Sequence, residues 1–302
     1  MQSIAAPDFA LKATLESGQL FRYRLGSNGF YNVVVGDSII KLKQHGNGVV
    51  FSGASSDFDV KRFLGLRQQY SRIVDSISRD EKISAAVRRH YGLRILEQEP
   101  WECTASFVCS SFSNIPRIRQ CIENVSTSFG DEVSFDGITA FSFPRPHQIN
   151  DFSKLSKCGL GYRAKYLFET ARIFANSGGE YSLRQMRKLD YVNAKKKLLE
   201  LPGVGEKVAD CILLFSYGFL GAFPVDVWVH RAMVGSYRDE LSKFAAAKNS
   251  GKITVKAVAG FARNYFGEYA GYAQQFLFHN IRTSTYKKKL PLASLFPYSE
   301  SR

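Results

Sequence analysis

Near the start of the chain, short apolar runs alternate with clusters of turn residues. Between Phe21 and Ser52 the runs FRYRL, FYNVVV, SIIKLK and VVFS are separated by SNG, GDS and HGNG. Because β-branched and aromatic residues favour strands and Gly/Asn/Asp clusters favour tight turns, this pattern predicts an antiparallel meander. A small sheet is therefore expected in this part of the chain.

After Asp57 the apolar positions recur at helical spacing, first at Val60, Phe63 and Leu64. Helices are expected to continue with brief breaks to about Tyr286. The fold class is thus predicted as α+β, with an antiparallel sheet domain and flanking helix at residues 1–95 and a helical domain at 96–302. Residues 287–302 combine a charge run with two prolines, which predicts a tail that packs over the surface or is partly loose.

Composition and charge narrow the class of partner. The chain has 302 residues, of which 45% are hydrophobic, enough for one large or two modest cores. Lys and Arg number 41 against 27 Asp and Glu, and the net charge of +14 favours a polyanion such as nucleic acid. Charge alone does not identify the polyanion, and a basic protein without such a ligand stays open.

Targeting and metal-binding patterns are missing from the sequence. It has no secretory start and no run of about 18 apolar residues, so the protein is expected inside the cell and off the membrane. The five cysteines are odd in number and form no C-x-x-C pair, which argues against a disulfide framework and a zinc site. They are Cys103, Cys109, Cys121, Cys158 and Cys211.

The most informative segment, residues 191–217, reads YVNAKKKLLELPGVGEKVADCILLFSY. It predicts a helix ending near Glu200, a tight LPGVG link and a second helix opening at Glu206 or Lys207, which together make a helix-hairpin-helix. Gly203 and Gly205 would let the backbone approach another group, and unpaired N–H groups at the second helix start suit a phosphate. The alternative is that the glycines only cap one helix and turn into the next.

Two side chains near this hairpin are candidates for chemistry. Lys207 lies in the first turn of a helix, where the dipole disfavours a cation and favours the neutral amine, the form that attacks carbon. Nineteen residues later, in AFPVDVWVHRAMV, Asp226 is expected at a helix N-cap. There it could stabilise positive charge on a sugar ring and handle a proton. The alternatives are a phosphate-binding lysine and an aspartate that only caps its helix.

LPGVGEKVADCILLF followed by FPVDVWVHR resembles the signature of the helix-hairpin-helix DNA glycosylase superfamily. Within it, SGQLFRYR, ECTASFVCSSFSNIPRI, LGYRAKYL and YAGYAQQFLF resemble segments of the 8-oxoguanine DNA glycosylase/AP lyases across nearly the whole chain. The resemblance implies an enzyme of base excision repair that flips out and excises 8-oxoguanine from duplex DNA. It would then cut the strand by β-elimination, acting as a monomer without a cofactor or metal.

The resemblance also implies residue roles. Lys207 would be the Schiff-base nucleophile and Asp226 its partner. The Gly18 carbonyl would read the N7 hydrogen of 8-oxoguanine, Gln274 its Watson-Crick edge, and Phe278 and Cys211 would sandwich its ring; for these last two, ordinary helix core is the alternative.

Further residues are implied in DNA binding, some as wedges and some as contacts to the opposite base or the backbone. They are Phe112, Ser113, Arg117, Tyr162, Arg163, Gly203, Gly205 and His230. For the LGYR segment that contains Tyr162 and Arg163, the alternative is an ordinary helix-capping segment.

The sequence departs from the family pattern in three places. Phe112 and Ser113 stand where an asparagine is usual, which leaves the preference for the opposite base open because an aromatic ring stacks but lacks the amide's polar contacts. Trp228 replaces a common histidine, a contact that His230 could supply. No cysteine follows Asp226, which excludes the four-cysteine iron-sulfur site of related branches.

Two other functions remain as alternatives. One is a related helix-hairpin-helix glycosylase for another damaged base, although Lys207 argues against the alkyl-purine enzymes. The other is a helix-hairpin-helix protein that binds DNA without chemistry, which has no use for Lys207 and Asp226 together.

Overall fold

Five antiparallel strands form a sheet in the order β1-β5-β4-β3-β2. The computed structural model describes residues 1–55, 58–248 and 251–287, so nearly all of the predicted tail at 287–302 lies outside the described residues. The strands of this sheet are β1 (Gln2–Ala5), β2 (Tyr23–Leu25), β3 (Tyr31–Val35), β4 (Ser38–His45) and β5 (Gly48–Ser52). Strands β2 to β5 confirm the predicted meander. Strand β1 was not predicted, because its four residues show no apolar alternation.

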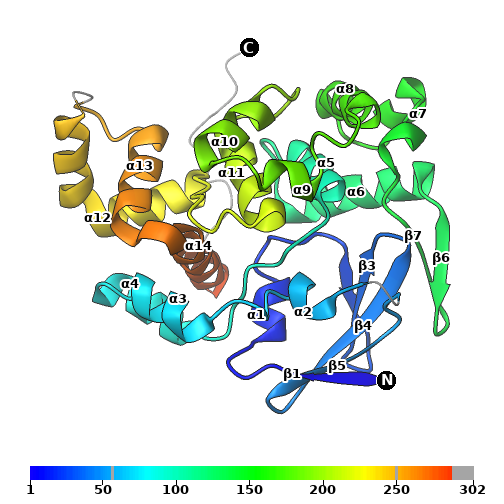
Figure 1. Ribbon diagram of the computed structural model, residues 1–302, viewed down its shortest axis with the longest axis horizontal. Coiled ribbons are helices and arrows are strands. Elements are labelled where there is room, and N and C mark those ends of the chain that lie inside the picture. The colour runs from blue at the N-terminus through cyan, green and yellow to red at the C-terminus, as the bar shows by residue number, and fades with distance from the viewer. Residues whose placement is uncertain (56–57, 249–250, 288–302) are drawn as a thin grey trace.

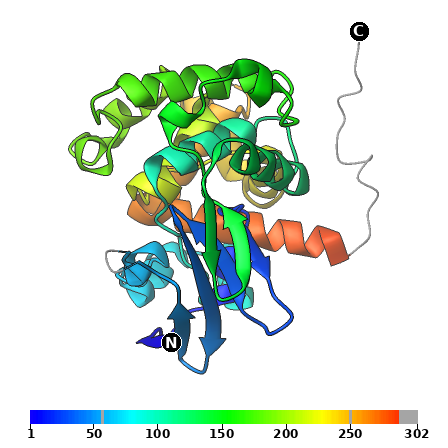
Figure 2. The same ribbon diagram turned by 90° about the vertical axis from the view of Figure 1, so that its right-hand side faces the viewer.

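Helices make up most of the remaining chain, which confirms the α+β class. They are α1 (Leu11–Leu15), α2 (Val60–Phe63), α3 (Tyr70–Ile77), α4 (Glu81–Arg89), α5 (Pro100–Cys109), α6 (Ile115–Phe129), α7 (Phe152–Ser156), α8 (Arg163–Asn176), α9 (Leu183–Met186), α10 (Tyr191–Leu199), α11 (Glu206–Ile212), α12 (Val227–Ala247), α13 (Val255–Phe266) and α14 (Ala270–Lys287). Two 3₁₀ turns, η1 (Pro146–Gln148) and η3 (Gly267–Tyr269), and a π-helical segment, η2 (Leu213–Tyr217), complete the helical elements of the described residues. In Figure 1 and Figure 2 the sheet lies below most of these helices.

A two-stranded hairpin interrupts the helices and corrects the expectation that helices run almost unbroken to Tyr286. Strands β6 (Glu132–Phe135) and β7 (Ile138–Phe141) pair around Asp136 and Gly137, whose φ angles are +50° and +75°. An Asp-Gly turn with two positive φ angles is the preferred connection of a tight hairpin. The signal was therefore present in DEVSFDGITAF, although the helical periodicity on either side obscured it.

Two groups of buried apolar side chains form the core. One joins the sheet to α1 and α2 and includes Val33, Ile40 and Leu42, all fully buried. The larger group joins the helices and also takes in α3 and α4, which pack against α14. The division at residue 95 stays a prediction.

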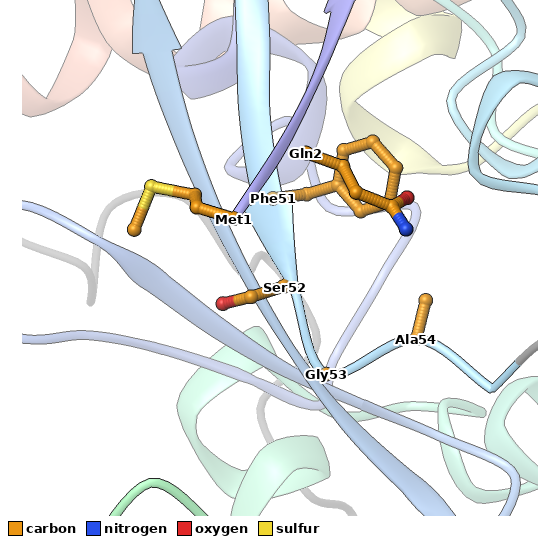
Figure 3. A pocket seen from close by; sticks show the side chains of 6 residues that line it. All are labelled: Met1, Gln2, Phe51, Ser52, Gly53 and Ala54. Carbon is orange, nitrogen blue, oxygen red and sulfur yellow. The ribbon is translucent and has the colours of Figure 1, made fainter.

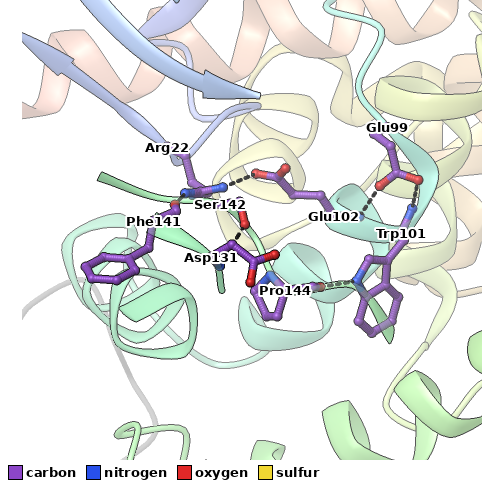
Figure 4. Close-up of polar contacts among 8 residues, drawn as sticks. All are labelled: Arg22, Glu99, Trp101, Glu102, Asp131, Phe141, Ser142 and Pro144. Carbon is purple, nitrogen blue, oxygen red and sulfur yellow. Dashed lines mark hydrogen bonds and ion pairs between the residues drawn. The ribbon is translucent and has the colours of Figure 1, made fainter. Parts of the chain in front are cut away.

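Arg22 joins the sheet to the helical part and to the β6–β7 hairpin. Its guanidinium donates to the Phe141 carbonyl and forms an ion pair with Glu102 at 3.4 Å, and both side chains are largely buried (Figure 4). Burial raises the pKa of the Glu102 carboxyl, although Arg22 lowers it in part. In the same region Glu99 caps α5, and the indole of Trp101 donates to the Pro144 carbonyl at 2.8 Å.

Two hollows open on this half of the molecule. A cleft of about 460 Å³ lies between β2, β3, α6 and the β6–β7 hairpin, with Arg22 and Asn32 in its wall. A smaller hollow of about 140 Å³ lies where β1 meets β5 and the residues after it (Figure 3). Neither is lined by Lys207 or Asp226.

We expect Arg22→Met to lower the free energy of unfolding by about 3 kcal/mol, because removing one partner leaves a buried charge uncompensated. The pKa of Glu102 is raised in the folded protein, so its ionisation costs stability as the pH rises through that pKa, and loss of Arg22 increases this cost. Urea denaturation at pH 5 and pH 8 should therefore show the larger loss at pH 8.

Arg24→Met is the matched control, because Arg24 pairs with Glu123 at the surface. That exposed pair should contribute less than about 1 kcal/mol. Equal losses in the two variants, or a loss in Arg22→Met that is larger at pH 5, would contradict this account.

Candidate active site

The predicted helix-hairpin-helix is present, with the boundaries that the sequence indicated. Helix α10 ends at Leu199 and α11 begins at Glu206, with the link between them. Gly203 has a φ of +77°, and a Cβ there would lie 2.8 Å from the Cβ of Tyr166, so both conformation and space require glycine. A Cβ at Gly205 would meet nothing within 4 Å. The backbone at Gly205 is therefore open to an incoming group.

Buried polar contacts hold the two hairpin helices together. The carboxylate of Asp210 is 2% exposed and accepts hydrogen bonds from Tyr191 at 2.6 Å and from Lys195 at 2.9 Å. Lys195 also pairs with Glu206 in the first turn of α11 at 2.7 Å. Because these contacts join α10 to α11, they fix the direction of the helix that begins beside Lys207.

Lys207 extends from the first turn of α11 toward the end of α5. Its Nζ donates to the Ser110 hydroxyl at 3.4 Å and lies 5.3 Å from the centre of the Phe107 ring. Its side chain is half-buried. The amine is thus held between an apolar ring and a neutral hydroxyl, in a place that the sequence alone did not connect with α5.

Asp226 is the N-cap of α12, as predicted, and accepts a hydrogen bond from the Val229 N–H at 2.8 Å. It also lies in the electrostatic range of Lys207. Burial raises the pKa of the Asp226 carboxyl, while the charge of Lys207 and the N–H groups of Val229 and Trp228 lower it. Capping and proximity to Lys207 are therefore both properties of this one side chain.

Cys211 lies one turn after Lys207 and is 3% exposed. Burial raises the pKa of its thiol to about 12, and Lys207 opposes this shift through its charge and a hydrogen bond. The thiol therefore stays neutral near pH 7. Lys207, Cys211 and Asp226, separated by up to 19 residues, come together in one place.

A second group of predicted residues comes together between α14 and the loop after α1. A Cβ at Gly18 would lie 3.1 Å from the ring of Phe278 and 3.1 Å from the side chain of Ile115. Gln274, one turn before Phe278, is 5% exposed, and its amide oxygen has no hydrogen-bond partner in the described part of the protein. A buried acceptor without a partner is costly, which suits a group reserved for a ligand.

Phe112 stands out from the surface between α5 and α6. Phe112 is 98% exposed, and its φ angle of +48° is rare for residues other than glycine. Arg163 is buried and donates to the carbonyls of Ser111, Phe112 (at 3.0 Å) and Leu160 (at 3.1 Å). In this structure Arg163 thus supports the loop that presents Phe112, and its own contact with DNA stays a prediction.

The other predicted DNA-binding residues lie at helix starts near the surface. Tyr162 is 54% exposed, in edge-to-face contact with Tyr166 at 6.0 Å, and Tyr166 packs on Gly203 of the hairpin. Arg117 is exposed in the first turn of α6, whereas Ser113 and His230 are half-buried. Sequence reasoning missed Ser110 and Ile115, although both flank the predicted Phe112.

The described residues contain no group of three or more His, Cys, Asp or Glu side chains that could hold a metal ion. None of their helices combines the length and apolar character needed to cross a bilayer.

The chain is similar in sequence to several known proteins. The family described as "8-oxoguanine DNA glycosylase, N-terminal domain" matches residues 3–104. A probable N-glycosylase/DNA lyase of Methanothermobacter thermautotrophicus is 34% identical over 227 residues, which cover 68% of each chain. The N-glycosylase/DNA lyase OGG1 of Arabidopsis thaliana is 32% identical over 284 residues, or 90% of this chain and 77% of the relative.

A solved structure extends the likeness to the backbone. The 8-oxoguanine glycosylase/lyase of Clostridium acetobutylicum, in complex with double-stranded DNA containing cytosine opposite 8-oxoG, superposes with a TM-score of 0.82. The two chains are 31% identical, and the match covers 92% of this chain and 93% of the other.

Proposed function

Because the chain belongs to the 8-oxoguanine DNA glycosylase/lyase family, we propose that it excises 8-oxoguanine from duplex DNA and then cuts the strand, with Lys207 as nucleophile and Asp226 as its partner. The observation that carries this proposal is the meeting of Lys207, Cys211 and Asp226 at the start of α11. We further propose that the protein acts as a monomer on cellular DNA.

The damaged nucleotide must leave the helical stack before Lys207 can reach its sugar, which costs a few kcal/mol. Phe112, exposed on a loop held by Arg163, is suited to fill the vacated space, and Tyr162 offers a second exposed ring. Backbone N–H groups at the open Gly205 would bind a phosphate at a helix start. Wedge and phosphate contacts together would offset the cost of extrusion.

In the extruded state the neutral Nζ of Lys207 attacks C1′ while the bond from C1′ to the base breaks, and the departing base takes up the proton that the attached amine loses. The carboxylate of Asp226 stabilises the positive charge that develops on the sugar ring. Ring opening then gives an imine between Lys207 and C1′. The imine makes the C2′ hydrogen acidic, and its removal expels the 3′ phosphate.

Recognition of the base is proposed for the second group of residues. The carbonyl of Gly18 accepts the N7 hydrogen of 8-oxoguanine, an atom that guanine lacks. Gln274, whose amide oxygen is buried without a partner, reads the Watson-Crick edge, and Phe278 and Cys211 cover the two faces of the ring. The closeness of Gly18 to Phe278 supports this assignment.

Replacing Lys207 with Gln should abolish borohydride trapping of the protein on DNA that contains 8-oxoguanine, because the amide cannot form an imine. Binding to the same duplex should change little. Lys196→Gln, at an exposed lysine of α10 in the same hairpin, is the control and should trap normally. Efficient trapping by the Lys207 variant would refute the nucleophile assignment.

Asp226→Asn should slow base release about 100-fold or more, since a positioned carboxylate is lost. Its thermal stability should stay the same or rise, because asparagine also caps helices and the cost of a buried charge disappears. In the wild type the raised pKa of Asp226 means that the carboxylate, and with it base release, is lost as the pH falls through that pKa.

Single-turnover rates between pH 4.5 and 8, with melting curves of both proteins, test these expectations. A purely structural cap would show itself by an Asn variant that melts earlier and loses DNA binding in proportion to activity.

A comparison of substrates separates the proposed function from its two alternatives. A duplex with 8-oxoguanine should be cut far faster than one with guanine or an alkylated purine, since only 8-oxoguanine offers a hydrogen at N7 to the Gly18 carbonyl. Strand cleavage with and without alkali is the measurement. Similar rates on all three duplexes would refute the proposed contact of the Gly18 carbonyl with N7. If none of the duplexes were cleaved, a binding protein without chemistry would be favoured.

A further inference from the structure

The loop that carries Gly18 is fixed on both sides by side chains from distant parts of the chain. The carbonyl of Glu16 accepts a hydrogen bond from Arg282, and that of Ser17 accepts one from Gln275 at 3.1 Å. The carbonyl of Gln19 accepts one from Gln98 at 2.8 Å. Three of four consecutive carbonyls are therefore held by a side-chain donor.

The carbonyl of Gly18 is the exception, because no hydrogen bond to it is present among the described residues. Gly18 itself is partly exposed, and its φ of +86° turns the chain between the two fixed segments. The side chain of Gln19 is fully buried and also holds this loop: its two N–H groups are shared among acceptors on Thr14, Ser17 and Arg94, and its amide oxygen accepts from the Leu96 N–H. Because the loop is held firmly, the free carbonyl of Gly18 has a fixed direction and is suited to accept a hydrogen bond from a donor on a ligand.

Helix α14 carries both Phe278, which lies against Gly18, and the donors that hold the loop. It crosses the molecule between the sheet and the upper helices (Figure 2). Gln275, Phe278 and Arg282 follow one another at helical intervals of three and four residues, so they share a face. Arg282 also lies 5.6 Å from the centre of the Phe278 ring, and the position of a Cβ at Gly18 is 3.6 Å from its guanidinium.

We propose that Gln275 and Arg282 are positioning residues that set the place and direction of the Gly18 carbonyl and thereby the selectivity for 8-oxoguanine over guanine. The inference rests on the proposed function and extends it to residues that do not touch the base. Guanine has a lone pair at N7, which the fixed carbonyl repels, whereas 8-oxoguanine has a hydrogen there. A loop free to move would relieve the repulsion and weaken the hydrogen bond, so discrimination requires that the loop be held.

Gln275→Met and Arg282→Met keep side-chain length and remove the donors. Each variant should slow single-turnover excision of 8-oxoguanine by about 10- to 100-fold, because a shift of about 1 Å in a positioned contact can cost that much in rate. Cleavage at a preformed abasic site needs Lys207 but no base contact, so it should change by less than about threefold. The rate of 8-oxoguanine excision divided by the rate of guanine excision should fall. Arg282→Lys, which retains a donor, should recover part of the loss.

Asn280→Ala is the matched control, because Asn280 lies on α14 but accepts from Arg89 on α4 instead of holding the Gly18 loop. It should leave both rates near those of the wild type. The inference fails if the Met variants excise 8-oxoguanine normally, lose abasic-site cleavage to the same extent, or behave like Asn280→Ala. A wild type that cleaves abasic sites but neither 8-oxoguanine nor guanine would instead refute the proposed substrate, and one inactive on every duplex would refute the enzyme.

Discussion

The site depends on one electrostatic arrangement: an amine at the positive end of a helix faces a partly buried carboxylate. The charge of Lys207 stabilises the ionised carboxylate of Asp226, whereas burial of that carboxylate disfavours its charge. The raised pKa of Asp226 shows that burial outweighs the help from Lys207 and from the N–H groups of α12. Bringing two such groups together requires a rigid frame.

The hairpin and its neighbours provide this frame. Asp210 joins α10 to α11 through Lys195, and Gly203 packs tightly on Tyr166, so the start of α11 is fixed from two sides. The end of α5 reaches Lys207 through Ser110. Elsewhere in the same core, α14 holds the Gly18 loop by side-chain donors to backbone carbonyls. The residues proposed for chemistry and those proposed for recognition therefore lie on different helices that share one core.

Local patterns in the sequence predicted the elements that are stabilised locally. Turn clusters predicted strands β2 to β5, the LPGVG link predicted the hairpin, and the proline before Asp226 indicated the start of α12. Strand β1 was not predicted, because it is stabilised by pairing with β5, about 45 residues later, and its own residues show no alternation of apolar and polar positions.

Local sequence patterns also do not predict contacts between residues that lie far apart along the chain. The bond from Lys207 to Ser110 spans 97 residues and that from Gln275 to Ser17 spans 258. The roles of Gly18, Gln274 and Phe278 came from the family resemblance, not from periodicity. The structure adds that Gly18 and Phe278 are neighbours, and that Arg163, expected at the DNA, is buried beneath the Phe112 loop.

The most direct test of the central claim is to locate the covalent bond itself. The wild-type protein would be reduced with borohydride on a duplex containing 8-oxoguanine, digested, and its cross-linked peptide sequenced by mass spectrometry. The account predicts a sugar adduct on Lys207. An adduct on the N-terminal amine or on a lysine outside α11, with Lys207 unmodified, would contradict it.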